Sequence, residues 1–164
     1  MAWTRFPRRP VAVVALAIGA LAGCTEGTDS STGCGPITRE ALDSAYLVHI
    51  INDELPVDYT SDPPTSGPHK PSPPATGVVG RPLSRPVQVG ILERGDVLLQ
   101  YAPELSRTDQ AALEALADAD VVVAPNPDLP DTVVATAWRS KRICGALAID
   151  DLEEFVSERS GQGP

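Results

Sequence analysis

The stretch VVVAPNPDLPDTVVATAW, residues 121–138, decides the fold of this chain. Its first four residues are apolar and mostly β-branched, which predicts a short buried strand that Pro125 ends. Residues 132–138 are again rich in β-branched side chains and predict a second strand. The prolines and aspartates between the two predict a turn, with Asp128 and Asp131 as turn acids.

The segment before this pair carries the clearest helix signal of the chain. Residues 106–118 read SRTDQAALEALAD. Ser106 and Asp109 have the spacing of a capping box, with Asp in place of the preferred Glu. Leu113 and Leu116 give the helix one apolar face.

Further elements extend the pattern in both directions. Residues 87–101 contain two apolar runs around Glu93-Arg94-Gly95-Asp96, a composition that predicts a β-hairpin. At the other end, Asp150 or Asp151 is expected to cap a last helix, because apolar residues follow at helical spacing. These apolar residues are Leu152, Phe155 and Val156.

A long irregular segment precedes the predicted hairpin. Residues 62–86 contain eight prolines, which exclude a continuous helix or a central strand and predict a long loop. Before the loop, residues 37–51 predict a short turn or helix and then a strand from Tyr46 to Ile51. Together the elements predict a single small α+β domain of mostly antiparallel strands, with two helices and a long proline-rich loop.

The N-terminal residues predict export and a lipid anchor. Arg5, Arg8 and Arg9 precede an uncharged apolar run, Val11–Gly23, which is too short to span a bilayer and fits a signal peptide. The run ends in Leu-Ala-Gly before Cys24, the pattern at which a lipoprotein signal peptide is cleaved and the cysteine carries lipid.

The predicted organisation is therefore a lipoprotein signal peptide at 1–23, a flexible tether at 24–33 and a globular domain at 34–160. We expect the domain to stand on the outer face of the cytoplasmic membrane. Its only expected membrane contact is through the lipid on Cys24. A protein partner in the cell envelope is a further expectation.

The charge balance argues against a nucleic-acid partner. The chain has 13 basic and 22 acidic residues. Cleavage after residue 23 removes three arginines and no acid, which leaves 10 basic residues against the same 22 acids. A domain so acidic is repelled by phosphate backbones and by anionic lipid headgroups.

Two cysteines, Cys34 and Cys144, remain near the ends of the mature domain. Outside the cytoplasmic membrane a disulfide between them is permitted, and closing so long a loop would stabilise the fold by roughly 4–5 kcal/mol. Free thiols or thiolate metal ligands are the alternatives, although neither cysteine has zinc-site spacing.

Three blocks of sequence resemble a bacterial family, the domain of unknown function 3105. They are Pro63-Pro64-Thr65-Ser66-Gly67-Pro68-His69, then Leu92-Glu93-Arg94-Gly95 followed by Tyr101, and Val121–Pro125 followed by Ala137-Trp138. The likeness covers about residues 47–157. It implies a secreted or membrane-attached protein and carries no established activity.

The family pattern also implies a candidate metal site. Its members have a histidine ahead of the PPTSGPH run, the histidine within it, and then V-H-x-L-E-H-G, a set that suits copper or zinc. In this chain His49, His69 and Glu93 match the pattern. Gly90 and Arg94 stand where the family has its other two histidines, and Arg94 could instead pair with Glu93 or with an anionic ligand.

We expect a non-enzymatic binding or accessory lipoprotein whose loop and hairpin form the interaction surface through Tyr59, Thr65, Ser66 and Arg94. The alternative is a reduced copper or zinc site made of His49, His69 and Glu93, with an open position. In the simplest reading His49 is a half-buried strand residue and His69 closes the loop by bonding to backbone. A hydrolase built from Ser66, His69 and Glu93 is a third hypothesis.

Overall fold

The computed structural model describes Met1 and residues 33–51, 57–71, 73 and 75–164. Residues 2–23 of the predicted signal peptide, Cys24 and residues 25–32 of the predicted tether lie outside the described residues. Within them, no helix has both the length and the apolar character needed to cross a membrane.

The centre of the molecule is a five-stranded sheet with the strand order β1-β5-β4-β2-β3. Only β2 and β3 run parallel, and the other neighbours are antiparallel. The α+β class with mostly antiparallel strands is therefore confirmed. The strands are β1 (Thr38–Arg39), β2 (Val97–Tyr101), β3 (Val121–Pro125), β4 (Val133–Ala137) and β5 (Ser140–Cys144).

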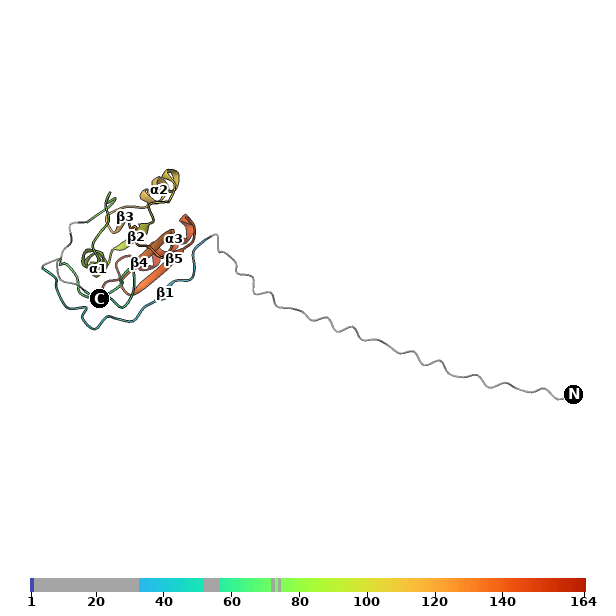
Figure 1. The fold of residues 1–164 in the computed structure, drawn as a ribbon, viewed down its shortest axis with the longest axis horizontal. Helices are drawn as coiled ribbons and strands as arrows, with labels where there is room; N and C mark the ends of the chain where they lie inside the picture. Colours follow the sequence, from blue (N-terminus) through green and yellow to red (C-terminus); the bar gives the residue numbers. More distant parts are fainter. Residues whose placement is uncertain (2–32, 52–56, 72, 74) are drawn as a thin grey trace.

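Three helices cover the two faces of this sheet (Figure 1). They are α1 (Arg85–Glu93), α2 (Arg107–Glu114) and α3 (Ile149–Arg159). Leu113 of α2 and Phe155 of α3 are fully buried in one core cluster with the side chains of Val97, Leu99 and their neighbours. Ile91 and Leu92 of α1 pack on the opposite face, against Leu98 and Val122. The alternation along β2 therefore separates a core of α2 and α3 from a core under α1.

Several sequence expectations are confirmed. The strands at 121–124 and 132–138 are β3 and β4. The capping box begins α2, since Ser106 Oγ accepts a hydrogen bond from the backbone N–H of Asp109 at 3.1 Å. The last helix is also present, but its N-cap position is Ala148, and Asp150 and Asp151 fill the first turn, where acidic side chains favour the helix dipole.

The predicted hairpin over residues 87–101 is wrong in its first half. Residues 85–93 form α1, and only the second half is a strand, β2. The predicted turn at Glu93–Asp96 is present between α1 and β2, with Gly95 at a φ of 91°. Ser84 precedes the helix in an extended conformation and a proline stands in its first turn, which favours a helix start. Five successive residues, Gln88–Leu92, are buried, so the run shows no helical period.

The other corrections concern short strands. Residues 46–51 do not form a strand of the sheet, and His49 makes only a single parallel bridge with His69. β1 and β5 were not predicted. In β5, Lys141 faces one side of the sheet and Arg142 the other, and both are buried against acidic partners. Because Lys141 and Arg142 are adjacent and charged, the sequence of β5 lacks the apolar pattern that predicts a strand.

The predicted disulfide between Cys34 and Cys144 is confirmed. Cys144 ends β5 and is completely buried in the core under α3. The bond, together with Gly35 N–H donating to Ile143 O at 2.8 Å, attaches the start of the domain to the sheet. The long loop that follows β1 is therefore anchored at its beginning.

Candidate functional site

A short backbone ladder brings two histidines together. Ile50 N–H donates to His69 O at 2.7 Å, and His69 N–H donates to Val48 O at 3.0 Å. This pairing places His49 directly beside His69, with ring centroids 4.9 Å apart and ring planes at 76°. The two histidines are 20 positions apart in the sequence, so the ladder, and not their spacing, creates the pair.

The side chain of His69 is buried and its tautomer is set by a backbone contact. Its Nδ1 lies 3.1 Å from the carbonyl oxygen of Gly67. A carbonyl oxygen can only accept a hydrogen bond, so Nδ1 carries the proton. In a neutral imidazole the lone pair then sits on Nε2, which is the arrangement of a metal-binding histidine.

Nε2 of His69 faces a carboxylate. It lies 2.8 Å from Oε2 of Glu93, yet it has no partner at hydrogen-bonding geometry. Two electron-pair donors so close repel each other unless a proton or a metal ion lies between them. Two ligand atoms that each lie 2.0–2.2 Å from one ion are roughly 2.8–3.6 Å apart at coordination angles of 90–110°. The observed distance therefore suits two ligands of one metal ion.

His49 completes a group of three potential ligands. One ligand atom each of His49, His69 and Glu93 lies within 4.8 Å of the others. His69 is buried, Glu93 is partly exposed and His49 is exposed. At the coordination angles of 90–110° used above, three atoms bound to one ion lie roughly 2.8–3.6 Å apart, so the exposed side chain of His49 would have to move closer by up to about 1.2 Å.

Glu93 reaches this position because α1 approaches the loop closely. Lys70 N–H donates to Pro86 O at 2.9 Å at the start of α1. A Cβ atom added to Gly90 would lie 2.3 Å from Lys70 O, a distance that real Cβ atoms do not show. Only glycine permits this contact, which sets Glu93, one turn further along the helix, against His69.

The loop that carries His69 is fixed by its own polar residues. Gly67 has a φ of 130°, and a Cβ there would lie 3.0 Å from the Tyr59 ring. Tyr59 Oη donates to Pro68 O at 2.7 Å. Burial raises the pKa of Tyr59 to about 12, with Arg85 lowering it and Asp43 raising it, so the phenol stays a donor over the physiological range. Ser66 Oγ accepts from Asp43 N–H at 2.9 Å.

A carboxylate at Glu40 ties the same loop to β5. Its Oε2 accepts from Thr65 Oγ1 at 2.8 Å and from Ser61 Oγ, while Oε1 lies 2.9 Å from the buried Lys141 Nζ. Burial raises the pKa of Glu40, but the hydrogen bonds from Ser61, Lys141 and Thr65 outweigh it and hold the pKa below its ordinary value. The carboxylate is therefore ionised and paired in the native state.

The comparison with protein families agrees with the earlier resemblance. Residues 50–164 match the model of the family described as protein of unknown function (DUF3105). The chain belongs to this family. His69 and Glu93 lie within the matched range and His49 directly precedes it. No curated protein and no solved structure matches the chain.

Two positions distinguish this DUF3105 domain from the family pattern described above, and the structure assigns both to packing. Gly90 makes room for Lys70. Arg94 donates to Pro73 O at 2.5 Å and to Ala75 O at 2.8 Å, and pairs with Asp96. Arg94 thus fastens the proline-rich loop to the end of α1, and the pairing with Glu93 considered above is not formed.

The four residues predicted to form a binding surface in the DUF3105 domain take different places. Thr65 and Ser66 are buried and hold the loop, while Tyr59 is half-buried and Arg94 is exposed. Ser66 Oγ bonds to Asp43, and His69 directs its nitrogens to Gly67 and Glu93. These contacts give the hydroxyl of Ser66 no base, so the arrangement does not support a hydrolase.

Sequence reasoning missed the residues that hold the DUF3105 loop in place, namely Glu40, Asp43, Ser61 and Lys141. One signal was present in the sequence. Lys141 lies between Trp138 and Cys144 in a short segment that must return to the core, and a buried lysine requires an acidic partner. Which acid serves as that partner depends on contacts across most of the chain.

Proposed function

We propose that this protein binds one divalent transition-metal ion, Cu(II) or Zn(II), at His49, His69 and Glu93. The observation that carries the proposal is the buried Nε2 of His69, which lies 2.8 Å from Glu93 Oε2 outside hydrogen-bonding geometry. Two imidazoles and a carboxylate contain no sulfur, so they suit divalent copper or zinc better than Cu(I). Cu(II) should bind more tightly than Zn(II) in the same donor set.

The role we propose is non-enzymatic, in a protein anchored outside the cell membrane through Cys24. Three protein ligands leave at least one coordination position of the ion open. His49, the exposed ligand, stands among exposed aliphatic side chains, since Leu47 is 75%, Val48 50% and Ile51 92% exposed. An apolar rim around an accessible ligand supports transfer of the ion to or from an envelope protein that docks there.

Metal titration tests the proposal. The sample is the full-length chain with Cys24→Ala, which removes the one cysteine outside the Cys34–Cys144 disulfide as a competing ligand. Calorimetry with Cu(II) and with Zn(II) should show one ion per chain. His69→Ala, His49→Ala and Glu93→Gln should each weaken binding by at least about 100-fold, because changes behind the ligands alone already cost 10–100-fold.

Glu153→Gln is the matched control, because Glu153 is an exposed carboxylate on α3, the helix that covers the opposite face of the sheet. It should bind like the parent. Binding that survives His69→Ala, or no binding by the parent protein, would overturn the proposal. The second result would leave Glu93 and His69 as a proton-linked ion pair that fastens α1 to the loop.

A further inference from the structure

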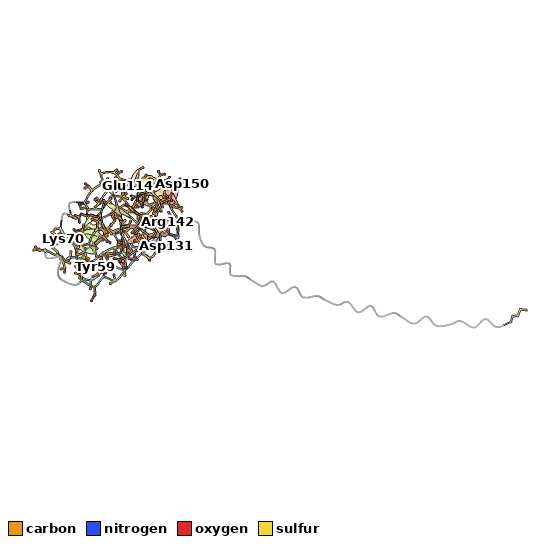
Figure 2. All side chains as sticks on the ribbon, turned by 45° about the horizontal axis from the view of Figure 1, so that its top comes forward. Tyr59, Lys70, Glu114, Asp131, Arg142 and Asp150 are labelled. Atoms are coloured by element: carbon orange, nitrogen blue, oxygen red, sulfur yellow. A yellow bond between two sulfur atoms is a disulfide. The ribbon has the colours of Figure 1, made fainter. Side chains whose placement is uncertain are left out.

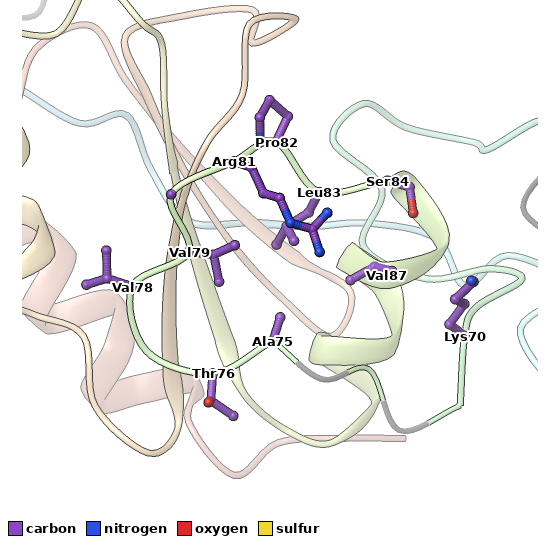
Figure 3. Close-up of a pocket in the computed structure, with 11 residues that line it drawn as sticks. Lys70, Ala75, Thr76, Val78, Val79, Arg81, Pro82, Leu83, Ser84 and Val87 are labelled. Atoms are coloured by element: carbon purple, nitrogen blue, oxygen red, sulfur yellow. The ribbon is translucent and has the colours of Figure 1, made fainter.

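A groove lies next to α1, built from residues other than the proposed ligands. It has a volume of about 810 Å3 and runs between the segment Ala75–Ser84 and Val87 of α1. Figure 3 shows the side chains of Ala75, Val79 and Val87 pointing toward one another across it. Its volume falls in the range of small-molecule sites.

The floor of the groove is apolar and continuous with the core. Ala75 and Leu83 are buried in the cluster beneath α1, and Val79 and Val87 pack against that cluster while remaining partly exposed. Backbone bonds hold the wall in place, since Val79 N–H donates to Val123 O at 2.8 Å and Gly77 O accepts from Val123 N–H at 3.0 Å. The groove is thus a fixed extension of the sheet, and a hydrocarbon chain would find a preformed apolar floor there.

The described residues at the rim of the groove include two basic side chains. Of the described residues, Lys70 and Arg81 are the charged ones that line it, and no described acidic residue does, in a chain with 22 acids and 13 basic residues. Among the described residues Arg81 makes no hydrogen bond or ion pair, and its guanidinium extends over the groove between Leu83 and Val87 (Figure 3). The hydroxyl of Ser84 caps no backbone group of α1. An arginine above an apolar floor matches a carboxylate joined to a hydrocarbon chain.

We infer that the groove binds an aliphatic carboxylate, with its chain along Ala75, Val79 and Val87 and its head group on Arg81. Ser84 adds a hydroxyl donor beside that head group. This site is separate from the metal ligands, so neither proposal depends on the other. Lys70, which follows His69 directly, is the residue that the two regions share.

Calorimetry of the full-length Cys24→Ala protein, with decanoate as the probe below its micelle concentration, tests the inference. We expect one decanoate per chain. Acetate has the carboxylate without the long alkyl chain, and decanol has the alkyl chain without the carboxylate. Each should bind at least about tenfold more weakly than decanoate. Arg81→Gln should lower the decanoate affinity about tenfold, as the loss of a charge-assisted hydrogen bond does.

Arg39→Gln is the matched control. Arg39 is an exposed arginine on β1, at the opposite edge of the sheet from β3 and the groove. Amide chemical shifts of Val79 and Val87 should move with decanoate in the parent protein and in Arg39→Gln. Equal affinities for decanol and decanoate, equal effects of the two arginine substitutions, or binding of a glutamate-rich peptide but not of decanoate would overturn the inference.

Discussion

Glu40 Oε1 lies 2.9 Å from Nζ of Lys141, whose side chain is only 5% exposed. This pair connects β5 to the loop that presents His69, because the other oxygen of Glu40 accepts from Ser61 and Thr65. Figure 2 shows Tyr59 and Lys70 at the end of the domain that carries this loop, and Glu114 and Asp150 of α2 and α3 at the other end. The loop therefore depends on a contact made far along the chain.

Removing the charge of Glu40 should destabilise the protein. Glu40→Gln leaves the Lys141 ammonium buried without its counter-ion, and we expect a loss of about 2–4 kcal/mol in the free energy of unfolding. Urea denaturation measures it. Glu153→Gln should change stability by less than about 0.5 kcal/mol. If the double variant Glu40→Gln, Lys141→Met is no more stable than Glu40→Gln alone, the ion pair is not the cause.

The same carboxylate predicts a pH dependence. The pKa of Glu40 is lower in the folded protein than its ordinary value of 4.5. A depressed pKa contributes stability that is present above the unfolded pKa and is lost as the pH falls through the folded pKa. The stability difference between parent and Glu40→Gln should therefore be constant from pH 7 to about 5 and shrink below that. A difference that grows on acidification would contradict the assignment.

The disulfide should make a large contribution to stability. Cys34 and Cys144 are 110 positions apart, so their bond closes most of the domain into one loop. Replacing both with alanine should cost about 4–5 kcal/mol in the chain-entropy account. Thermal and urea unfolding of the double variant, compared with the parent under non-reducing conditions, measure the loss. A loss in unfolding free energy below about 1 kcal/mol would show that the pairing of β1 with β5 alone holds the N-terminal end of the domain against the sheet.

Gly90→Ala should destabilise the protein although alanine favours helices. The added Cβ would lie 2.3 Å from Lys70 O, so the loop must move away from α1. We expect a loss of about 1–3 kcal/mol, typical of overpacking, together with weaker metal binding as Glu93 separates from His69. Gly80→Ala is the control, since its Cβ would meet no atom within 4 Å. Equal stability of the two variants would disprove the close approach.

Arg94→His tests whether the family's histidine at this position can join the site. The substitution removes the bonds to Pro73 O and Ala75 O and the pair with Asp96. We expect a loss of about 1–3 kcal/mol in stability and still one metal ion per chain. Urea denaturation and metal titration give both values. A tenfold gain in Cu(II) affinity would instead show that position 94 reaches the metal.

The extent of sequence prediction differs from element to element. Strands β3 and β4 and helix α2 follow from local apolar runs, prolines and a capping box, which act within a few residues. Helix α1 does not follow from local sequence. Gly90 lets the loop cover the outer side of this helix, so the helix has no polar face whose period would predict it. Strand β5 was missed because Lys141 and Arg142 are neutralised by Glu40, Asp151 and Glu154, partners that no local pattern shows.

For the candidate site, the family resemblance suggested the members and the tertiary structure supplied the geometry. His49, His69 and Glu93 match a family pattern of residues that suits copper or zinc. Their convergence rests on the ladder between Val48–Ile50 and His69 and on the contact of Gly90 with Lys70. Both are long-range backbone contacts. Thr65 and Ser66 are conspicuous in the sequence, but hydroxyl groups serve loop anchoring as readily as binding.

The position of Cys34 also has a mechanical consequence if Cys24 is held in a membrane. Tension on the anchor would enter the domain at residue 33 and pass at once through the covalent Cys34–Cys144 bond into β5, the strand next to β1 in the sheet. The segment that carries His49 and His69 lies beyond that junction. Movement of the membrane or drag on the domain would therefore load the sheet before the segment that carries His49 and His69.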